Sequence, residues 1–184
     1  MLINKLISLL LLLMLLPAMT IIAIIIFIND GLPIFFKQKR IGLNNKIFLI
    51  YKYRTMKNNT PDEASHLIKN KGKYLLSSGT FLRKYSLDEL PQLINIIKGD
   101  LVFIGPRPAL YNQYDLIKLR EDKGIHKLTP GITGWAQING RDNLSNKEKV
   151  HLDNYYLKNA SFSLRVKIIY KTIFKVIKAE NVND

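Results

Sequence analysis

A chain of 184 residues with 28 Lys and Arg but only 14 Asp and Glu has a formal charge of +14, which predicts an anionic partner. Nucleic acid, acidic lipid and phosphorylated small molecules all fit that charge, and composition does not choose among them. The absence of cysteine excludes a disulfide framework and a thiolate zinc site.

The segment from Leu6 to Ile28 has no charged side chain and is long enough for a membrane helix, which needs about 20 apolar residues. It does not end in the small residues of a signal-peptide cleavage site, so a cleaved signal peptide is disfavoured. Pro17 divides it into two equal arms, each roughly 16 Å long as a helix and about half as long as the hydrocarbon core is thick. A kinked spanning helix and a helix that leaves by the face it entered both remain open.

Seven basic residues and no acidic residue lie between Asp30 and Asp62. A basic cluster beside an apolar segment stays on the cytoplasmic side and attracts anionic lipid, so we expect the rest of the chain to face the cytoplasm. The cluster consists of Lys37, Lys39, Arg40, Lys46, Lys52, Arg54 and Lys57.

Residues 33–56 predict a β-hairpin with a turn at Leu43–Asn45 and a second arm rich in β-branched and aromatic residues. Alternation along that arm would place Lys52 and Arg54 on one face, and a solvated edge strand is the simpler interpretation of this basic face. The polar segment over residues 60–73 is expected to be a surface segment or a short helix.

The remainder predicts one small, mostly helical α+β domain without an internal repeat. Gly99 should end the first of its helices, and Thr129–Gly131 should form a turn. Helices are expected over residues 87–98, 111–122, 145–158 and 163–178, a short buried strand over 101–104, and an extended segment over 132–138.

The last predicted helix is basic and amphipathic. Its apolar residues, such as Ile169 and Ile173, lie mainly on a different side from a stripe of lysines. Such a helix fits a membrane surface and fits packing against a domain core about equally well, and both alternatives stay open. The stripe consists of Lys167, Lys171, Lys175 and Lys178.

The stretch SLDELPQL, Ser86–Leu93, contains two adjacent carboxylates in a basic chain. Ser86 and Glu89 have the spacing of a capping box, which is a structural explanation for the stretch. Asp88 and Glu89 would also suit chemistry, because a carboxylate near cations stays ionised and can attack phosphorus or bind a metal ion.

Two arginines are candidate cations for such a site. Arg83 precedes the acid pair by five residues, and Arg107 lies between two prolines in Gly105–Pro108, which restricts its backbone. A rigidly held guanidinium suits bidentate phosphate recognition, although an arginine in a surface turn is the simpler interpretation. The three histidines lack metal-ligand spacing, and there is no nucleophile elbow, Walker loop or dinucleotide glycine fingerprint.

Taken together, the motifs resemble one family, the bacterial sugar transferases. These are the monotopic phosphoglycosyltransferases that act on polyprenol phosphate, and the chain is similar to their minimal form with a single membrane segment. The motifs, in order, are RTM at Arg54–Met56, SLDELPQL at Ser86–Leu93, GDLVFIGPRP at Gly99–Pro108, TPGITGWAQINGR at Thr129–Arg141 and DNYYL at Asp153–Leu157.

The resemblance implies transfer of a sugar 1-phosphate from a UDP-sugar to polyprenol (undecaprenyl) phosphate. UMP is released, and the polyprenyl diphosphosugar initiates surface glycan or glycoprotein assembly. It further implies Mg²⁺ as cofactor and a location on the cytoplasmic face of the bacterial inner membrane, in contact with its lipid. Downstream glycosyltransferases are candidate partners, and nucleic acid is not expected.

Carried onto this chain, the resemblance makes Asp88 the nucleophile of a phosphosugar–aspartyl intermediate and Glu89 its acid–base or metal-positioning partner. Both carboxylates are implied metal ligands. Arg83 and Arg107 would hold the diphosphate, and the role of Asp153 is left unassigned. Further contacts with the substrate are implied for Lys52, Arg54 and Arg141.

The resemblance also implies a proline-broken re-entrant helix over residues 1–30, broken at Pro17, and a cytoplasmic catalytic domain over 31–184. The sequence departs from the family pattern at Leu16-Pro17, where Ser-Pro is expected, and at Leu164-Arg165, where an acid is expected after Leu. The alternative function is a membrane-tethered basic adaptor that binds anionic lipid or nucleic acid without catalysis.

Overall fold

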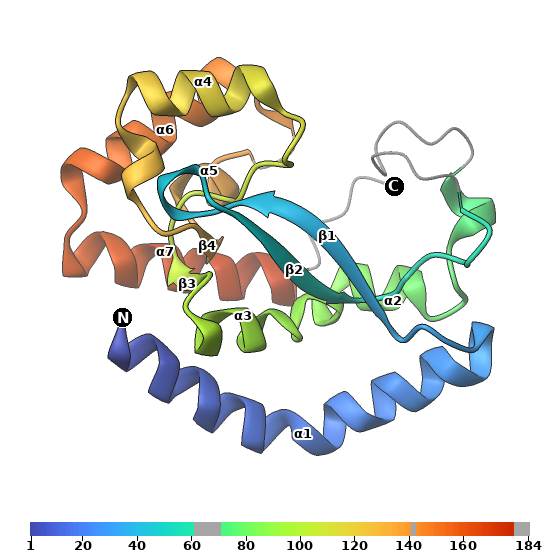
Figure 1. Ribbon diagram of the computed structural model, residues 1–184. Coiled ribbons are helices and arrows are strands. Elements are labelled where there is room, and N and C mark those ends of the chain that lie inside the picture. Colours follow the sequence, from blue (N-terminus) through green and yellow to red (C-terminus); the bar gives the residue numbers. More distant parts are fainter. Residues whose placement is uncertain (61–70, 141–142, 179–184) are drawn as a thin grey trace.

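The structure, a computed structural model, describes residues 1–60, 71–140 and 143–178 and has a mixed α and β fold (Figure 1). One long helix lies beneath a body made of a twisted hairpin, a two-stranded parallel pair and shorter helices. The α+β class predicted from the sequence is therefore confirmed. The polar segment predicted over residues 60–73 lies largely outside the described residues.

Helix α1 (Leu2–Asp30) contains the apolar run and is the one helix in the described part of the chain that is long and apolar enough to cross a membrane. Its axis bends near the middle, and both ends turn toward the body (Figure 1). Pro17 lies inside the helix and lacks the amide hydrogen needed there. The Thr20 hydroxyl donates to the Leu16 carbonyl at 2.9 Å, a contact that often accompanies helix bending.

The predicted hairpin is confirmed. Strands β1 (Phe35–Ile41) and β2 (Ile47–Tyr53) pair antiparallel and are joined by the 3-10 turn η1 (Leu43–Asn45). Asn44 and Asn45 have positive φ values of 51° and 59°, a conformation that asparagine tolerates better than most residues. The turn therefore falls where the sequence predicts it.

The helix predicted over residues 87–98 is interrupted near Pro91, because this residue has no amide hydrogen and is best tolerated at a helix start. Gly99 ends the regular part as predicted, with a φ of 94°. The elements of this region are η2 (Lys71–Tyr74), α2 (Gly79–Lys84), η3 (Leu87–Glu89) and α3 (Gln92–Lys98).

The predicted capping box of Ser86 and Glu89 is wrong. Ser86 has a left-handed backbone conformation with a φ of 54°, whereas a capping residue needs an extended one. The Glu89 carboxylate accepts a hydrogen bond from Lys52 instead. A capping box does form between Ser145 and Glu148, at the start of another helix.

The rest of the body follows the predicted order with three corrections. The turn predicted over Thr129–Gly131 is wrong, because Gly131 is the first residue of a strand and pairs with Val102. The polar helix begins at Tyr114 rather than at 111, and the extended segment over 132–138 stops at Thr133 because a short helix follows, in which Gln137 Nε2 bonds back to the Ile132 carbonyl at 2.7 Å. A strand forms at the predicted place, but it covers Val102–Ile104 and its residues are half-buried rather than buried. The last two helices are confirmed. The elements are β3 (Val102–Ile104), α4 (Tyr114–Asp122), η4 (Ile125–Lys127), β4 (Gly131–Thr133), α5 (Trp135–Ile138), α6 (Asn146–Asn159) and α7 (Phe162–Ile177).

Three glycines allow the two short parallel strands to meet closely. A Cβ atom on Gly131 would lie 2.1 Å from the Gly105 nitrogen, and one on Gly134 would lie 2.1 Å from the Gly105 oxygen. No side chain fits at such distances, and the Gly105 amide donates to the Thr133 carbonyl at 2.8 Å. The glycines of GDLVFIGPRP and TPGITGWAQINGR therefore join two distant motifs.

Helix α1 packs on the body through a buried apolar cluster. Met19 and Ile26 share this cluster with Tyr53, Leu76 and Leu82. The Tyr53 hydroxyl donates to the Met19 carbonyl at 2.7 Å, and burial raises the pKa of Tyr53 to about 12. The second half of α1 is thus fixed to the end of β2.

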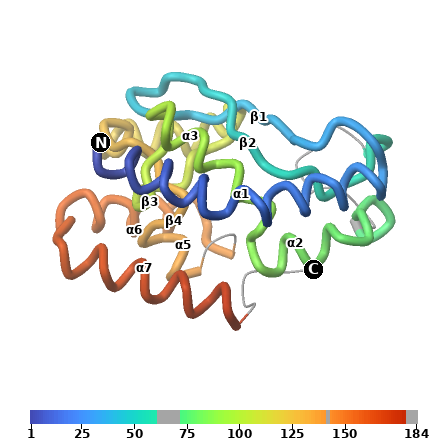
Figure 2. Tube along the Cα trace, turned by 90° about the horizontal axis from the view of Figure 1, so that it is seen from below, coloured from blue at the N-terminus to red at the C-terminus, as the bar shows by residue number. Residues whose placement is uncertain are grey.

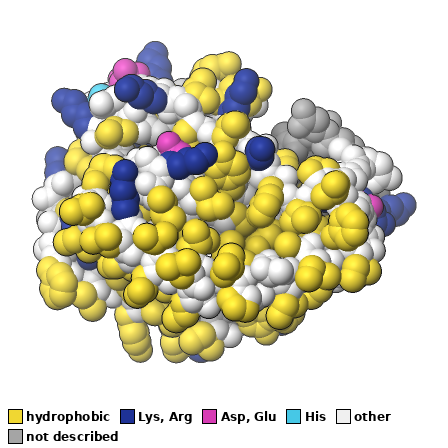
Figure 3. All heavy atoms as spheres, turned by 60° about the horizontal axis from the view of Figure 1, so that its bottom comes forward, with side chains coloured by type: hydrophobic (Ala, Val, Ile, Leu, Met, Phe, Trp, Pro, Cys, Tyr) yellow, Lys and Arg dark blue, Asp and Glu magenta, His cyan; other side chains and the backbone are white. Residues whose placement is uncertain are grey.

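The underside of the molecule is broadly apolar. Seen from below, α1 crosses this face and α7 runs along one edge of it (Figure 2). In the tilted space-filling view, hydrophobic side chains dominate the lower part of the face, and Lys and Arg gather toward its upper part (Figure 3). On α7 only Ile168 is fully buried, and the exposed large apolar residues are Phe162, Val166, Ile169, Tyr170, Ile173, Phe174 and Ile177.

Asn95 connects α3 to β2 and is the basis of a stability prediction. Its Oδ1 accepts from the Tyr51 amide at 3.0 Å, and its Nδ2 donates to the Leu49 carbonyl at 2.7 Å. The side chain is fully buried, so Asn95→Ala should lower the free energy of unfolding by about 2 to 4 kcal/mol, because it leaves backbone groups unpaired. Denaturation of the purified protein measures this loss. The exposed Asn159→Ala is the control, and equal losses in the two variants would contradict the prediction.

Candidate active site

The acid pair lies in the turn η3, between cations from two other segments. Lys52 of β2 donates from Nζ to Glu89 Oε1 at 2.7 Å, and Arg107 Nη2 lies 3.5 Å from the same oxygen. The Glu89 side chain is only 10% exposed, and Asp88 is buried. The structure therefore brings Lys52 and Arg107 to Glu89, and Asp88 precedes Glu89 in the same turn.

Arg83 also has the character of a ligand-binding residue. It lies on α2, which immediately precedes the turn that carries the acid pair. Its Nη1 is buried and has no hydrogen-bond partner among the described residues. A buried guanidinium nitrogen without a partner carries a desolvation cost, which an anionic ligand would offset.

Lys52 and Arg54 do not lie on one face or in one site, although strand alternation predicts that they project together. Strand β2 ends at Tyr53, so the alternation does not continue to Arg54. The Arg54 guanidinium pairs with the Asp30 carboxylate at 3.2 Å and donates to the Gly31 carbonyl at 2.7 Å. Arg54 thus satisfies carbonyl groups at the C-terminal end of α1.

The remaining predicted site residues lie elsewhere. Pro17 lies in α1, and Arg141 falls outside the described residues. Arg165, at one of the departures from the family pattern, is exposed on α7.

An open cleft of about 190 Å³ adjoins the acid pair. Glu89 and Arg107 lie on its wall beside residues that the sequence reasoning missed, namely Gln137, Thr172 and Lys175. Gln137 could have been found from its place in TPGITGWAQINGR, and Lys175 from the lysine stripe, but no local pattern indicates Thr172. The apolar lining consists of Leu90, Leu93, Ile132, Ile138 and Val176.

Gln137 is 9% exposed, and its Oε1 has no hydrogen-bond partner among the described residues. An acceptor buried in the wall of a cleft suits a ligand that can donate a hydrogen bond. The cleft thus combines charged groups near Glu89 with apolar surface toward α7.

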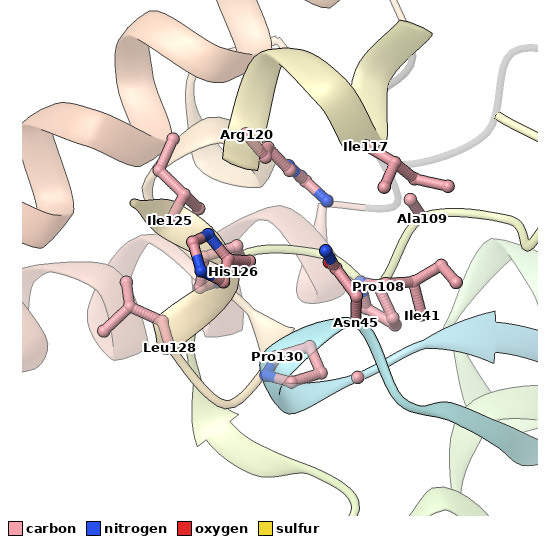
Figure 4. Close-up of a pocket in the computed structure, with 12 residues that line it drawn as sticks. Ile41, Asn45, Pro108, Ala109, Ile117, Arg120, Ile125, His126, Leu128 and Pro130 are labelled. Carbon is pink, nitrogen blue, oxygen red and sulfur yellow. The ribbon is translucent and has the colours of Figure 1, made fainter. Parts of the chain in front are cut away.

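The second cavity is much smaller and lies behind the loop that carries Arg107. Its volume is about 30 Å³, enough for about one water molecule, and it is lined by Pro108, Ala109, Arg120 and His126 among others (Figure 4). Its size excludes it as a site for a sugar nucleotide.

Asp153, whose role the sequence leaves open, is buried beside this loop rather than in the cleft. Its Oδ2 accepts from Arg120 Nη2 at 2.7 Å and from Arg120 Nε at 3.1 Å. Burial raises the pKa of Asp153, and the Arg120 charge partly offsets that increase. Asp153 is therefore half of a buried ion pair.

The donor groups fit Mg²⁺ as it is bound in phosphoryl-transfer sites. Mg²⁺ commonly takes one or two protein carboxylates and completes its coordination with water and substrate phosphate oxygens. Asp88 and Glu89 supply two adjacent carboxylates, whereas the described residues contain no group of three metal-ligating side chains. The acid pair therefore suits an ion that is shared with a substrate.

Comparison with known proteins identifies the class to which this fold and site belong. The family described as bacterial sugar transferase matches residues 1–179. The chain therefore belongs to the bacterial sugar transferase family.

Individual relatives are similar over most of this chain. An uncharacterized sugar transferase, EpsL, of Bacillus subtilis (strain 168) is 42% identical over 160 residues, which are 87% of this chain and 78% of EpsL. The UDP-glucose:undecaprenyl-phosphate glucose-1-phosphate transferase of Escherichia coli (strain K12) is 37% identical over 90% of this chain, but only 37% of that protein is covered. The UDP-N-acetylgalactosamine-undecaprenyl-phosphate N-acetylgalactosaminephosphotransferase of Aeromonas hydrophila is 35% identical over 88% of this chain and 39% of its own length. The chain thus spans little more than a third of the last two relatives.

Proposed function

We propose that the chain transfers a sugar 1-phosphate from a UDP-sugar to undecaprenyl phosphate and releases UMP. The observation that carries the proposal is the acid pair in η3, held between Lys52 and Arg107 at the edge of a cleft. Two of the relatives are named as transferases from a UDP-linked sugar to undecaprenyl phosphate, which supports the same pair of substrates.

The proposed reaction has two displacements at one phosphorus atom. An Asp88 carboxylate oxygen forms a bond to the phosphorus that carries the sugar, and the bond from that phosphorus to the bridging oxygen breaks, so UMP leaves with the oxygen. An oxygen of undecaprenyl phosphate then bonds to the same phosphorus, and the bond to Asp88 breaks. The carboxylate is regenerated, and the product is a polyprenyl diphosphosugar.

The surrounding residues have proposed roles in both steps. Arg83 and Arg107 bind diphosphate oxygens and stabilise the charge that develops on them. Lys52 orients the Glu89 carboxylate through their ion pair, and Glu89 accepts the proton of a singly ionised acceptor phosphate. Asp88 and Glu89 would hold Mg²⁺, which supplies further charge neutralisation on the phosphates when it is bound.

UMP release tests this function directly. Detergent-solubilised protein is given undecaprenyl phosphate, Mg²⁺ and a panel of UDP-sugars, and UMP is measured with and without the lipid. Lipid-dependent UMP from one donor is the expected result, and it identifies the sugar. A protein that binds anionic vesicles but releases no UMP with any donor would instead support the basic adaptor.

We further propose that α1 is re-entrant and that the body lies on the cytoplasmic face. Near one end of α1, Asn4 Oδ1 accepts from the Phe103 amide at 3.3 Å, and at the other end Asp30 pairs with Arg54. A straight helix of 29 residues would separate its ends by about 44 Å, more than the hydrocarbon core is thick. Contacts of both ends with one body support a helix that enters and leaves by the same face.

The apolar part of α7 supports the same arrangement. Helix α7 runs along one edge of the face that α1 crosses (Figure 2), it carries exposed apolar residues, and its lysines suit contact with anionic headgroups. Such a docking would hold the cleft, which α7 lines through Thr172 and Lys175, at the level of lipid phosphates.

Cysteine labelling tests the re-entrant geometry, because the chain has no native cysteine. Leu2→Cys and Glu121→Cys, both at exposed positions, are labelled with a membrane-impermeant maleimide in spheroplasts and in inverted vesicles. A re-entrant helix predicts that both are labelled only in inverted vesicles. Labelling of Leu2→Cys in intact spheroplasts, with Glu121→Cys protected, would show a spanning helix.

A further inference from the structure

The loop that presents Arg107 is held by its main chain. Four successive carbonyl groups, those of residues 106–109, each accept a hydrogen bond from outside the loop. The donors are the Gly131 amide at 2.9 Å, Arg120 Nη1 at 2.8 Å, Arg40 Nη1 at 3.0 Å and the Ile41 amide at 2.9 Å, in the order of the carbonyls. The loop is therefore bound to β4, α4 and β1 at once.

The Arg120 guanidinium makes two sets of hydrogen bonds, one to the Arg107 carbonyl and one to the Asp153 carboxylate. Nε and Nη2 face Asp153 Oδ2, whereas Nη1 reaches the loop. The side chains are nearly buried, with 11% of Arg120 and 2% of Asp153 exposed. Lysine lacks this planar fork and cannot make both contacts.

Packing alone does not fix the loop on this side. The cavity of about 30 Å³ lies against Pro106, Pro108 and Ala109, with the Arg120 side chain extending toward it from α4 (Figure 4). A loop that borders a cavity has fewer side-chain contacts there, so hydrogen bonds contribute more to holding it in place. The Arg120 contact supplies such a bond at the residue whose side chain faces Glu89.

The buried ion pair also needs an explanation other than stability. Two well-packed apolar residues commonly replace a buried ion pair without loss of stability, since burial removes both charges from water. The geometry of the pair, in contrast, orients Arg120 Nη1 toward the Arg107 carbonyl.

We propose that Arg120, held by Asp153, is a positioning residue that fixes the Arg107 main chain so that the Arg107 guanidinium meets the substrate diphosphate beside Glu89. This inference rests on the proposed function.

A double-mutant cycle tests whether Arg120 acts through Arg107. Because a misplacement of about 1 Å can cost roughly 100-fold in rate, Arg120→Met is expected to lower kcat/KM for the UDP-sugar about 10- to 100-fold. In an Arg107→Ala background the same change should cost less than about 3-fold, because the guanidinium that it positions is gone. Equal fold losses in the two backgrounds would overturn the inference.

Unpaired Asp153 could unfold the single variant, so the cycle is repeated with the charge-free pair Arg120→Met and Asp153→Leu. Glu148→Ala is the matched control, because it removes the Ser145 capping box from α6, the helix of Asp153, without touching the loop. The fold loss in kcat/KM that Glu148→Ala causes should be the same in the wild-type and Arg107→Ala backgrounds. A cycle in which the paired variant behaves like this control would also contradict the proposal.

Hydrogen–deuterium exchange gives a readout that does not need activity. Loop exchange is read from the Gly131 and Ile41 amides, which donate to the carbonyls of Pro106 and Ala109. These two amides should exchange faster in the paired variant than in the wild type, while Glu148→Ala leaves them unchanged. Faster loop exchange in a protein that releases no UMP with any donor would refute the proposed function but support the positioning of the loop. Unchanged loop exchange would refute the positioning even if the variant loses activity.

Discussion

Asp88→Asn is expected to lower lipid-dependent UMP release at least about 1,000-fold, in line with the loss of a nucleophile in other enzymes. The neutral amide has nearly the same size as the carboxylate, but it is a poor nucleophile toward phosphorus. Asp88 is buried in η3, so the isosteric replacement preserves the packing of the turn. Initial rates with the donor identified in the panel measure the effect.

Asp115→Asn is the matched control, because Asp115 is an exposed acid in the first turn of α4. Its activity should equal that of the wild type. Melting curves of both variants should also coincide with that of the wild type, which would separate lost chemistry from lost fold. Undiminished turnover by Asp88→Asn would eliminate Asp88 as the nucleophile, although the family assignment would stand.

Arg107→Ala is expected to lower kcat about 100- to 1,000-fold, the usual cost of removing one preorganised donor from a developing charge. The guanidinium lies 3.5 Å from Glu89 and borders the cleft, where diphosphate oxygens are proposed to bind. Arg107→Lys should recover only part of the loss, because an ammonium group cannot form the bidentate contact. Steady-state UMP release over a range of UDP-sugar concentrations measures kcat and KM.

Arg165→Ala provides the control for this experiment, since Arg165 is an exposed arginine on α7 and is absent from the lining of the cleft. It removes the same charge and should change kcat less than about 2-fold, as is usual for surface substitutions. An Arg107→Ala variant with normal kcat and normal KM would show that this guanidinium does not bind the diphosphate.

The sequence correctly predicted the elements that depend on residues close together in the chain. The hairpin follows from its β-branched arm and the asparagine turn, and Gly99 ends α3 because glycine accepts a left-handed conformation. The capping box predicted at Ser86 was wrong because a contact between residues far apart in the sequence replaces it. The spacing from Ser86 to Glu89 fits a capping box, but the Glu89 carboxylate is paired instead with Lys52, 37 residues away in the sequence, and Ser86 has a left-handed conformation.

The site was only partly predictable for the same reason. Asp88, Glu89 and Arg107 stand in motifs that can be recognised along the chain, and the structure brings Arg107 to Glu89. Arg120, in contrast, has no motif around it, and its importance appears only when α4 and α6 pack and bring it to Asp153. Contacts between residues far apart in sequence need the fold before they can be seen.

The close contact of Gly105, Gly131 and Gly134 has a consequence for how the preference for the proposed sugar donor can change. The segment that follows Gly105 carries Arg107, and the segment that follows Gly134 carries Gln137, so two walls of the cleft start from one contact. Neither segment can move away from the other without breaking the Gly105–Thr133 hydrogen bond. A new sugar preference should therefore arise from exchanged side chains on α3, α5 or α7, while the spacing of the two loops stays constant.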